Sequence, residues 1–199
     1  MIAFLRGTLL EKAPNQAIIE TAGVGYDVTI PVSTFSSLPD KGKEIALRIY
    51  THVREDTIAL YGFHTQEEKR VFERLVGVSG IGPKLAITVL SGLKTTDLVE
   101  AIRGGHHDRL VRIPGVGRKT AERIVLELRD KLDGIAPGAA AATAAAPAAW
   151  SGAELDVLSA LTNLGAQRPQ AELAVRKAKA AGCPDDFEPL FRRALESLR

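Results

Sequence analysis

Two short segments of this chain carry the residue types that a phosphate group needs. Residues 78–84 read Val-Ser-Gly-Ile-Gly-Pro-Lys, and residues 113–119 read Ile-Pro-Gly-Val-Gly-Arg-Lys. In each segment two glycines let the backbone turn tightly and approach a partner, and a lysine follows at the same offset. Backbone N–H groups in such a turn, together with the first amides of a following helix, attract an anion. The chemistry indicated is phosphate binding.

The candidate phosphate-binding residues are the glycines, the apolar residues between them and the basic residues that follow. They are Gly80, Ile81, Gly82 and Lys84 in the first segment, and Gly115, Val116, Gly117, Arg118, Lys119 and Arg123 in the second. Pro83 suits the first position of a helix, because the N–H group missing from proline has no helical partner there. Either segment alone could equally be a glycine-capped helical turn with a solvated lysine.

The two segments belong to a longer internal repeat. Residues 75–93 align with residues 110–128 with seven identities, and four further pairs exchange one aliphatic residue for another. A duplication of this kind indicates a repeated supersecondary structure. The segments resemble tandem helix-hairpin-helix motifs, which hold DNA by its backbone. Such contacts position a duplex without specifying its sequence.

Composition and charge agree with a protein that binds the DNA backbone. The net charge of the 199 residues is +2, but residues 64–133, which contain both segments, carry +3 by themselves. The single cysteine, Cys183, excludes an internal disulfide and a cysteine-rich metal site. His106 and His107 lack a third clustered ligand, so we expect no metal and no cofactor. Because neither a signal peptide nor a membrane-spanning apolar run is seen, the sequence predicts a cytoplasmic protein.

The sequence predicts an α+β multidomain protein. Its chain divides into four parts, which must position these two segments. Residues 1–63 contain five short strand-like runs and predict an OB-like β-barrel. Residues 64–133 predict a helical domain with the tandem hairpins. Residues 134–150 are rich in alanine, contain proline and predict a flexible linker. Residues 151–199 show three amphipathic patterns and predict a three-helix bundle.

Two capping boxes mark expected helix starts. Thr65 is followed three residues later by Glu68, and Ser151 is followed in the same way by Glu154. In this motif the hydroxyl accepts a hydrogen bond from the glutamate N–H, while the glutamate side chain accepts one from the backbone N–H of the capping residue. The helical domain and the C-terminal bundle are each expected to open at one of these boxes.

Aromatic residues in the predicted barrel leave two interpretations open. OB-folds can bind single strands by stacking bases on exposed aromatic side chains, which would make the chain a sequence-neutral single-strand-binding protein. The same side chains fit positions in the barrel core, and we favour that interpretation. The residues concerned are Phe4, Tyr26, Tyr50, Tyr61 and Phe63.

Glu55 and Asp56 lie between the last two predicted strands, at an expected hairpin tip. Ordinary turn chemistry accounts for acidic residues at such a place, because aspartate and its neighbours favour exposed turns. The position is nevertheless unusual for two adjacent carboxylates, since this domain is expected to face DNA.

The order of β-barrel, tandem hairpins, alanine-rich linker and three-helix bundle resembles the RuvA family along essentially the whole chain. These are the Holliday-junction-binding subunits of the bacterial RuvAB branch-migration complex. The resemblance implies a non-catalytic homotetramer, or an octamer on DNA, that holds a four-way junction open and flat. It also implies that Glu55 and Asp56 form an acidic pin at the junction centre.

The resemblance further implies partners. The C-terminal bundle would recruit a RuvB-type hexameric ATPase for branch migration in recombination, DNA repair and the SOS response, with a RuvC-type resolvase in the same pathway. The chain has no G-x-x-x-x-G-K-[ST] loop, so nucleotide hydrolysis must come from the partner. Apolar candidates for contact with the motor are Leu158, Leu161, Leu190 and Phe191.

An enzymatic alternative rests on the second segment, which also resembles the hairpin of helix-hairpin-helix DNA glycosylases. Lys119 would then be the catalytic nucleophile. That family needs an aspartate further along the chain, and the nearest acid here, Asp133, lies too early. A flipped base also needs a pocket between helical domains, which the predicted β-barrel and linker do not supply. We therefore expect a binding protein.

Overall fold

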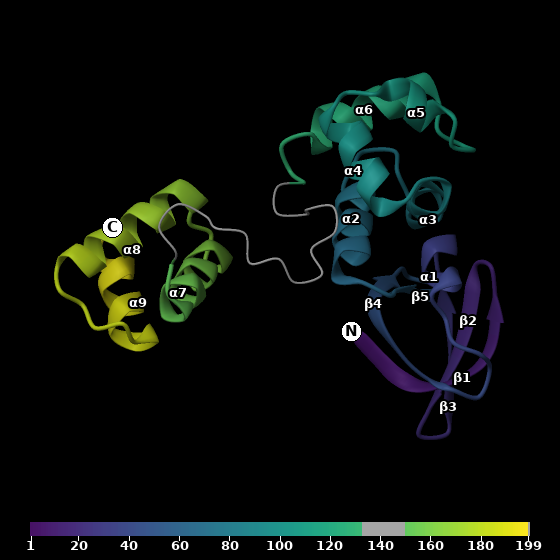
Figure 1. Cartoon of the computed structure of the whole chain (residues 1–199), viewed down its shortest axis with the longest axis horizontal. Helices are drawn as coiled ribbons and strands as arrows, with labels where there is room; N and C mark the ends of the chain where they lie inside the picture. The colour runs from purple at the N-terminus through teal and green to yellow at the C-terminus, as the bar shows by residue number, and fades with distance from the viewer. Residues whose placement is uncertain (133–149, 199) are drawn as a thin grey trace. The chain divides into compact units, whose positions relative to one another are not determined.

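A computed structural model describes residues 1–132 and 150–198 of the chain (Figure 1). The chain divides into two compact units, Met1–Ala140 and Ala141–Arg199. Across the described residues, the model contains no helix with the length and apolar character needed to cross a bilayer. The linker expected over residues 134–150 lies outside the described residues except for Trp150.

The first unit begins with a closed five-stranded barrel, which confirms the predicted fold. Its strands are β1 (Phe4–Ala13), β2 (Gln16–Thr21), β3 (Val24–Thr29), β4 (Glu44–Val53) and β5 (Ile58–Phe63). They pair in the order β1-β2-β3-β5-β4, and β4 returns to pair with β1. The contact between β3 and β5 is parallel, which closes the barrel. A short helix, α1 (Val32–Ser36), follows β3.

The barrel core is aliphatic, and the expectation that aromatic side chains fill it is largely wrong. Phe4 is 53% exposed, and of the five aromatic residues Tyr26 alone packs against the core inside the barrel. Tyr61 and Phe63 instead belong to the hydrophobic core of the adjoining helical domain, where Tyr50 also packs. The reason is that the last two strands are covered on both faces, so apolar residues of either parity are buried.

Five further helices follow the barrel in the described part of the first unit. They are α2 (Gln66–Val76), α3 (Pro83–Gly92), α4 (Thr95–Arg103), α5 (His107–Val111) and α6 (Arg118–Leu128). The predicted capping box at the start of α2 is confirmed, because Thr65 Oγ1 accepts a hydrogen bond from the Glu68 N–H at 3.1 Å. Helix α2 contacts both β4 and β5, and α3 lies beside α1 of the barrel (Figure 1).

Polar contacts, one of them fully buried, tie the barrel to the helical domain. The Glu68 side chain, only 6% exposed, accepts hydrogen bonds from Thr34 Oγ1 at 3.0 Å and from the His64 N–H at 3.1 Å. The Val32 N–H donates to Ser91 Oγ of α3 at 3.1 Å. A buried carboxylate is costly unless it is hydrogen-bonded, so these bonds favour one arrangement of the two domains. The β4–β5 hairpin is thereby fixed relative to the helical hairpins.

The described part of the second unit is a bundle of three helices, as predicted. They are α7 (Gly152–Asn163), α8 (Arg168–Ala180) and α9 (Phe187–Glu196), and each contributes to one small apolar core. The core includes alanines of α8 such as Ala171 and Ala174, whose small side chains let the neighbouring helices pack closely. The Arg176 guanidinium lies 5.3 Å from the centre of the Trp150 ring, where the described chain resumes.

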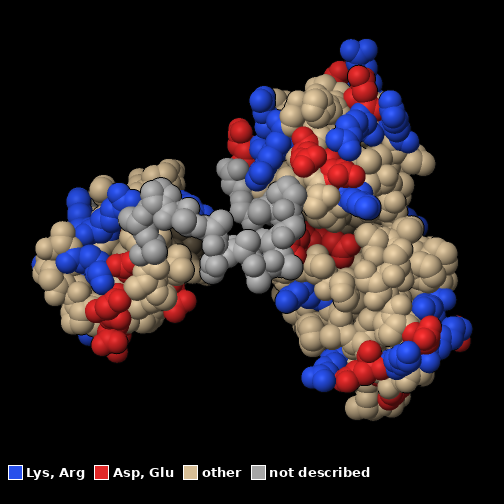
Figure 2. Space-filling view, in the orientation of Figure 1, with Lys and Arg blue, Asp and Glu red and all other residues tan. Residues whose placement is uncertain are grey.

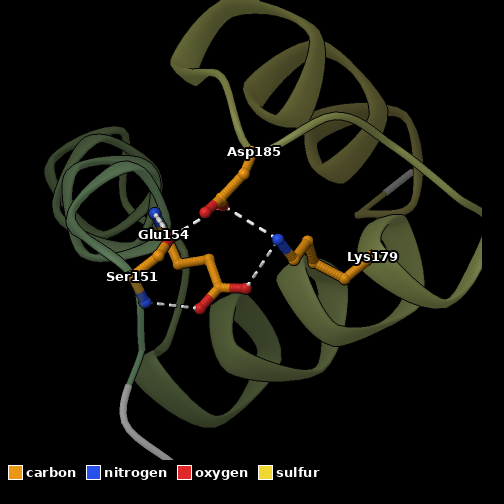
Figure 3. A network of polar contacts seen from close by, with 4 residues as sticks. All are labelled: Ser151, Glu154, Lys179 and Asp185. Atoms are coloured by element: carbon orange, nitrogen blue, oxygen red, sulfur yellow. Dashed lines mark hydrogen bonds and ion pairs between the residues drawn. The ribbon is translucent and has the colours of Figure 1, made fainter.

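A polar network staples the start of α7 to the end of α8 (Figure 3). The predicted capping box is confirmed, with Glu154 accepting a hydrogen bond from the Ser151 N–H at 2.7 Å. Lys179 Nζ lies 3.3 Å from Glu154 and 2.8 Å from Asp185. Its hydrogen bond, helped by that of the Ser151 hydroxyl, lowers the pKa of Asp185, and the same contact with Asp185 raises the pKa of Lys179. Ion pairs and hydrogen bonds therefore join α7, the end of α8 and the loop before α9 within the bundle.

Candidate nucleic-acid interface

The two predicted hairpins have the same backbone structure. Gly80 and Gly115 adopt positive φ values of +87° and +83°. Two residues later, Gly82 and Gly117 are the N-caps of α3 and α6, with φ near −87° and −81° and ψ of 169° in both. The sequence duplication thus corresponds to two matching turns, each leading into a helix.

The apolar residue between each pair of glycines shapes the turn. The Ile81 N–H donates to the Val78 carbonyl at 3.0 Å, and the Val116 N–H donates to the Ile113 carbonyl at 3.0 Å. Ile81 and Val116 are each 4% exposed. Because their side chains are buried and their amides are bonded within the turn, these two residues fix the shape of the hairpin. Their place in the phosphate-binding set stays a prediction.

Amides at the start of each helix point away from the helix with no partner along it. The first hydrogen bonds along each helix are donated by the Ala86 N–H to the Gly82 carbonyl at 3.0 Å and by the Ala121 N–H to the Gly117 carbonyl at 2.9 Å. The amides before them have no intrahelical acceptor. Pro83 occupies the start of α3 as expected. These ends of α3 and α6 also carry the positive end of the helix dipole, which favours a phosphate oxygen.

Basic side chains surround the two helix starts. Lys84 and Lys119 are exposed, and neither forms an ion pair with any acid in the described chain. Arg118 is exposed as well, although its Nε lies 3.1 Å from Glu122 Oε1. Each hairpin therefore presents a lysine that is free to approach an anion. In the view of Figure 2, Lys and Arg side chains gather over the end of the unit formed by α5 and α6, with acidic side chains among them.

Arg123 is exposed on α6 and also contacts the first hairpin. Its Nη1 donates to the Ser79 carbonyl at 2.9 Å, so this residue of the second motif supports the first hairpin. In return, Leu85 of α3 reaches the second hairpin, where its Cδ1 lies 3.2 Å from the position of a Cβ added to Gly115. Each hairpin is thus braced by the helix that follows the other. Their separation is fixed by this reciprocal contact.

The four glycines of the two hairpins fall into two kinds by their backbone conformation. At Gly80 and Gly115 a side chain would be strained by the positive φ. At Gly82 and Gly117 the backbone is ordinary, and no atom lies within 4 Å of an added Cβ. Glycine is one of the residues favoured at a helix N-cap, although the backbone here does not require it. The absence of a side chain also leaves the backbone open to an external group.

Substitution of one glycine of each kind should affect stability and binding differently. We expect Gly115→Ala to lower the free energy of unfolding by about 1 kcal/mol, because alanine disfavours positive φ. We expect Gly117→Ala to lower stability by up to about 1 kcal/mol, because alanine is a poorer N-cap than glycine, and also to weaken DNA binding roughly tenfold, because its methyl group blocks a charge-assisted hydrogen bond. Urea unfolding and DNA titration of both variants test this. Equal DNA affinity for Gly117→Ala and the wild type would contradict it.

The β4–β5 hairpin places Glu55 and Asp56 at its tip, as expected. Arg54 and Thr57 exchange backbone hydrogen bonds at 2.8 and 3.4 Å, so the two acids form a two-residue loop. Both acids are exposed. Beneath the tip, Val53 pairs with Ile58, and these side chains are 65% and 71% exposed. Sequence reasoning did not single out this exposed apolar pair.

A groove of about 490 Å³ runs between this hairpin and the first helical hairpin. Its walls come from β4, β5 and the start of α3, and they carry cationic, acidic, aromatic and hydroxyl side chains. The lining residues are His52, Arg54, Asp56, Thr57, Ala59, Tyr61, Gly82, Pro83 and Lys84. The sequence did not reveal this groove, because it depends on how the barrel packs against the helical domain.

The partner-contact residues expected in the bundle are mostly inaccessible. Leu161 and Leu190 are fully buried and Leu158 is 9% exposed, so these three form the bundle core and the prediction is wrong for them. Phe191 is partly buried and stacks on Phe187 with ring centres 5.5 Å apart. The helical pattern could not show which apolar face turns inward. Among the described residues of the bundle, the large apolar side chains that are exposed are Leu155, Leu164, Leu173, Phe187 and Leu195.

Comparisons with known proteins cover the whole chain. Residues 1–62 match the family model "RuvA N terminal domain", and residues 72–130 match the model "SAM-like Helix-hairpin-helix tandem". A protein of Solibacter usitatus named "Holliday junction branch migration complex subunit RuvA" is 65% identical over 202 residues, which cover 100% of both chains. Proteins with the same name are 59% identical in Acidobacterium capsulatum and 47% identical in Myxococcus xanthus, over 100% of this chain.

Proposed function

Because this chain belongs to the RuvA family, we propose that it binds Holliday junctions as the DNA-binding subunit of a branch-migration complex. The observation that carries the proposal is the pair of matching hairpins, each with unpartnered helix-start amides and a free lysine. Its expected place of action is the cytoplasm, where bacterial DNA lies.

The hairpins explain recognition without base reading. Two similar phosphate sites at a fixed separation suit the two strands of one duplex arm across a groove. Lys84 and Lys119 would each neutralise a phosphate and release counterions, so that affinity depends strongly on salt. Gly82 and Gly117 would allow the DNA backbone to approach the protein backbone. Any sequence can be held in this way, as a branch point that moves along DNA requires.

Junction geometry would be recognised through assembly. A four-way junction has four arms, and a homotetramer would hold one arm per subunit, with a second tetramer on the opposite face in an octamer. The Glu55-Asp56 tips would then meet near the crossover. Carboxylates there would repel phosphates and keep strands apart at the point of exchange. This supports an open, flat junction.

The chain would be a non-catalytic subunit whose motor is a separate protein. It carries no phosphate-binding loop of the nucleotide-hydrolysing type. A RuvB-type hexameric ATPase would supply the energy, and a RuvC-type resolvase would act in the same pathway. The C-terminal bundle would recruit the ATPase, and the exposed Leu155, Leu173 and Phe187 are available for such contacts.

The alternative functions receive less support. Single-strand binding on the barrel would need exposed aromatic residues, and of the five considered Phe4 is the one that is substantially exposed. A glycosylase would need an acid near Lys119 in space. Asp133, the acid weighed for that role, lies outside the described residues.

The direct test is binding of the full-length protein to a four-way junction, a linear duplex and a single strand of equal length at several salt concentrations. We expect a strong preference for the junction, together with a tetramer or octamer by native mass measurement. Stimulation of a RuvB-type ATPase should follow in the same preparation. Equal affinity for the three DNAs by a monomer would refute the proposal.

A further inference from the structure

A tyrosine hydroxyl without a partner in the described part of the protein lines the groove between the acidic tip and the first hairpin. Tyr61 lies on its wall and is only 6% exposed. The ring packs against Phe72 with centres 5.2 Å apart, and against Tyr50 and His52 at 6.5 Å. The Tyr61 hydroxyl makes no hydrogen bond to any residue that the structure describes. The hydroxyl oxygen remains accessible to water from the groove, so a ligand there can replace that water as its hydrogen-bond partner.

The state of this hydroxyl suits an anionic partner. A tyrosine hydroxyl is protonated at neutral pH, and burial raises the pKa of Tyr61 further. A protonated phenol donates one hydrogen bond. Its ring contacts hold it in place, so little freedom is lost when a ligand binds.

Cationic side chains flank the same groove. Lys84 lies at the start of α3, beside amides that have no intrahelical acceptor. On the opposite wall Arg54 donates from Nε to His52 Nε2 at 3.0 Å, which leaves its terminal nitrogens available. Two cations face one carboxylate, Asp56, within the lining. The balance favours a ligand that carries a single negative charge.

We propose that this groove binds one phosphodiester of the DNA strand that leaves the first hairpin and runs toward the acidic tip, with the Tyr61 hydroxyl donating to a phosphate oxygen. The inference rests on the proposed function, because the ligand is the junction strand held by that hairpin. The groove is continuous with the helix start that would hold the preceding phosphate. Its volume of about 490 Å³ accommodates a sugar-phosphate unit.

The two hairpins then have different tasks. No lining residue of the groove comes from the second hairpin, whose Gly117 and Lys119 lie outside it. The second hairpin clamps its strand alone, whereas the first also passes its strand along the barrel. Asp56 closes the path and repels a further phosphate. The strand is therefore turned aside at the tip after one phosphodiester.

The test compares Tyr61→Phe, which removes only the hydroxyl, with Tyr26→Phe, a tyrosine that packs against the barrel core and does not line the groove. We expect Tyr61→Phe to weaken four-way junction binding roughly tenfold through loss of a hydrogen bond to a charged group. The salt dependence should not change, because no charge is removed. Tyr26→Phe should bind like the wild type.

A second variant blocks the groove by bulk. Ala59→Leu should fill part of it and weaken junction binding as well. Thermal unfolding of each variant verifies the fold. Wild-type junction affinity in either variant, at wild-type stability, would overturn the proposal. Lys119→Ala is the control for the proposed function, because Lys119 lies outside the groove. It should weaken junction binding even if the groove binds no phosphodiester, so failure of the groove proposal can be told from failure of the proposed function.

Discussion

Replacing both Lys84 and Lys119 by alanine should reduce affinity for a four-way junction by roughly 100-fold at moderate salt and lower the salt slope by about two units. Each lysine is exposed, unpaired in the described chain and next to a helix start. Loss of one phosphate contact removes both a charge-assisted hydrogen bond and the release of about one counterion. The two losses of binding free energy should add, because each lysine would contact a different phosphate.

The measurement is a set of junction titrations at several salt concentrations. A matched control is Lys41→Ala with Lys131→Ala, two exposed lysines outside both hairpins. It removes the same charge and should change the salt slope by less. A slope as steep in the Lys84 and Lys119 variant as in the wild type would mean that the hairpins do not hold phosphates.

Removal of the second unit should abolish stimulation of the motor while sparing DNA binding. The unit Met1–Ala140 contains the barrel, both hairpins and their cores, whereas Ala141–Arg199 has an apolar core of its own. Units with separate cores commonly fold alone. We expect the first unit to bind a junction within roughly twofold of the full chain, because no predicted phosphate contact is removed. Stimulation of a RuvB-type ATPase should fall to the background.

Addition of the second unit in trans provides the control. It should compete with the full chain for the ATPase and lower the observed stimulation, because it carries the proposed motor contacts without DNA sites. Leu173→Ser, on the exposed face, should weaken this competition with little effect on stability. Full stimulation of the motor by the first unit alone would remove the bundle from the motor-binding role.

Features that depend on local chemistry were predictable from the sequence. The capping boxes of Thr65 and Ser151 form as expected, because the acceptor and donor lie three residues apart. The paired turns at Gly80 and Gly115 are equally local, since positive φ and the following helix start are specified within a few residues. The strands of the barrel also follow from short apolar runs. These features rest on contacts between near neighbours in the chain.

Features that depend on packing between distant segments were not predictable. Tyr61 lies opposite Tyr50 in the sheet, and its orientation toward Phe72 is set by α2 covering the outer face of the strands. Arg123 reaches Ser79 across 44 positions of the chain. Nothing in the alternation of apolar and polar residues distinguishes a barrel interior from a covered exterior. The groove was not predictable for the same reason, because it forms where the barrel packs against the helical domain.

The buried hydrogen bonds of Glu68 have a mechanical consequence. When a DNA arm is pulled, load entering at the helical hairpins can pass to the barrel through Thr34 and the backbone of His64, instead of being absorbed by a loosely packed joint. A stiff joint stores little of the work done on it. When the arm is pulled, the DNA at the crossover deforms in preference to the joint between the two domains. The work of pulling then goes into exchanging base pairs at the crossover.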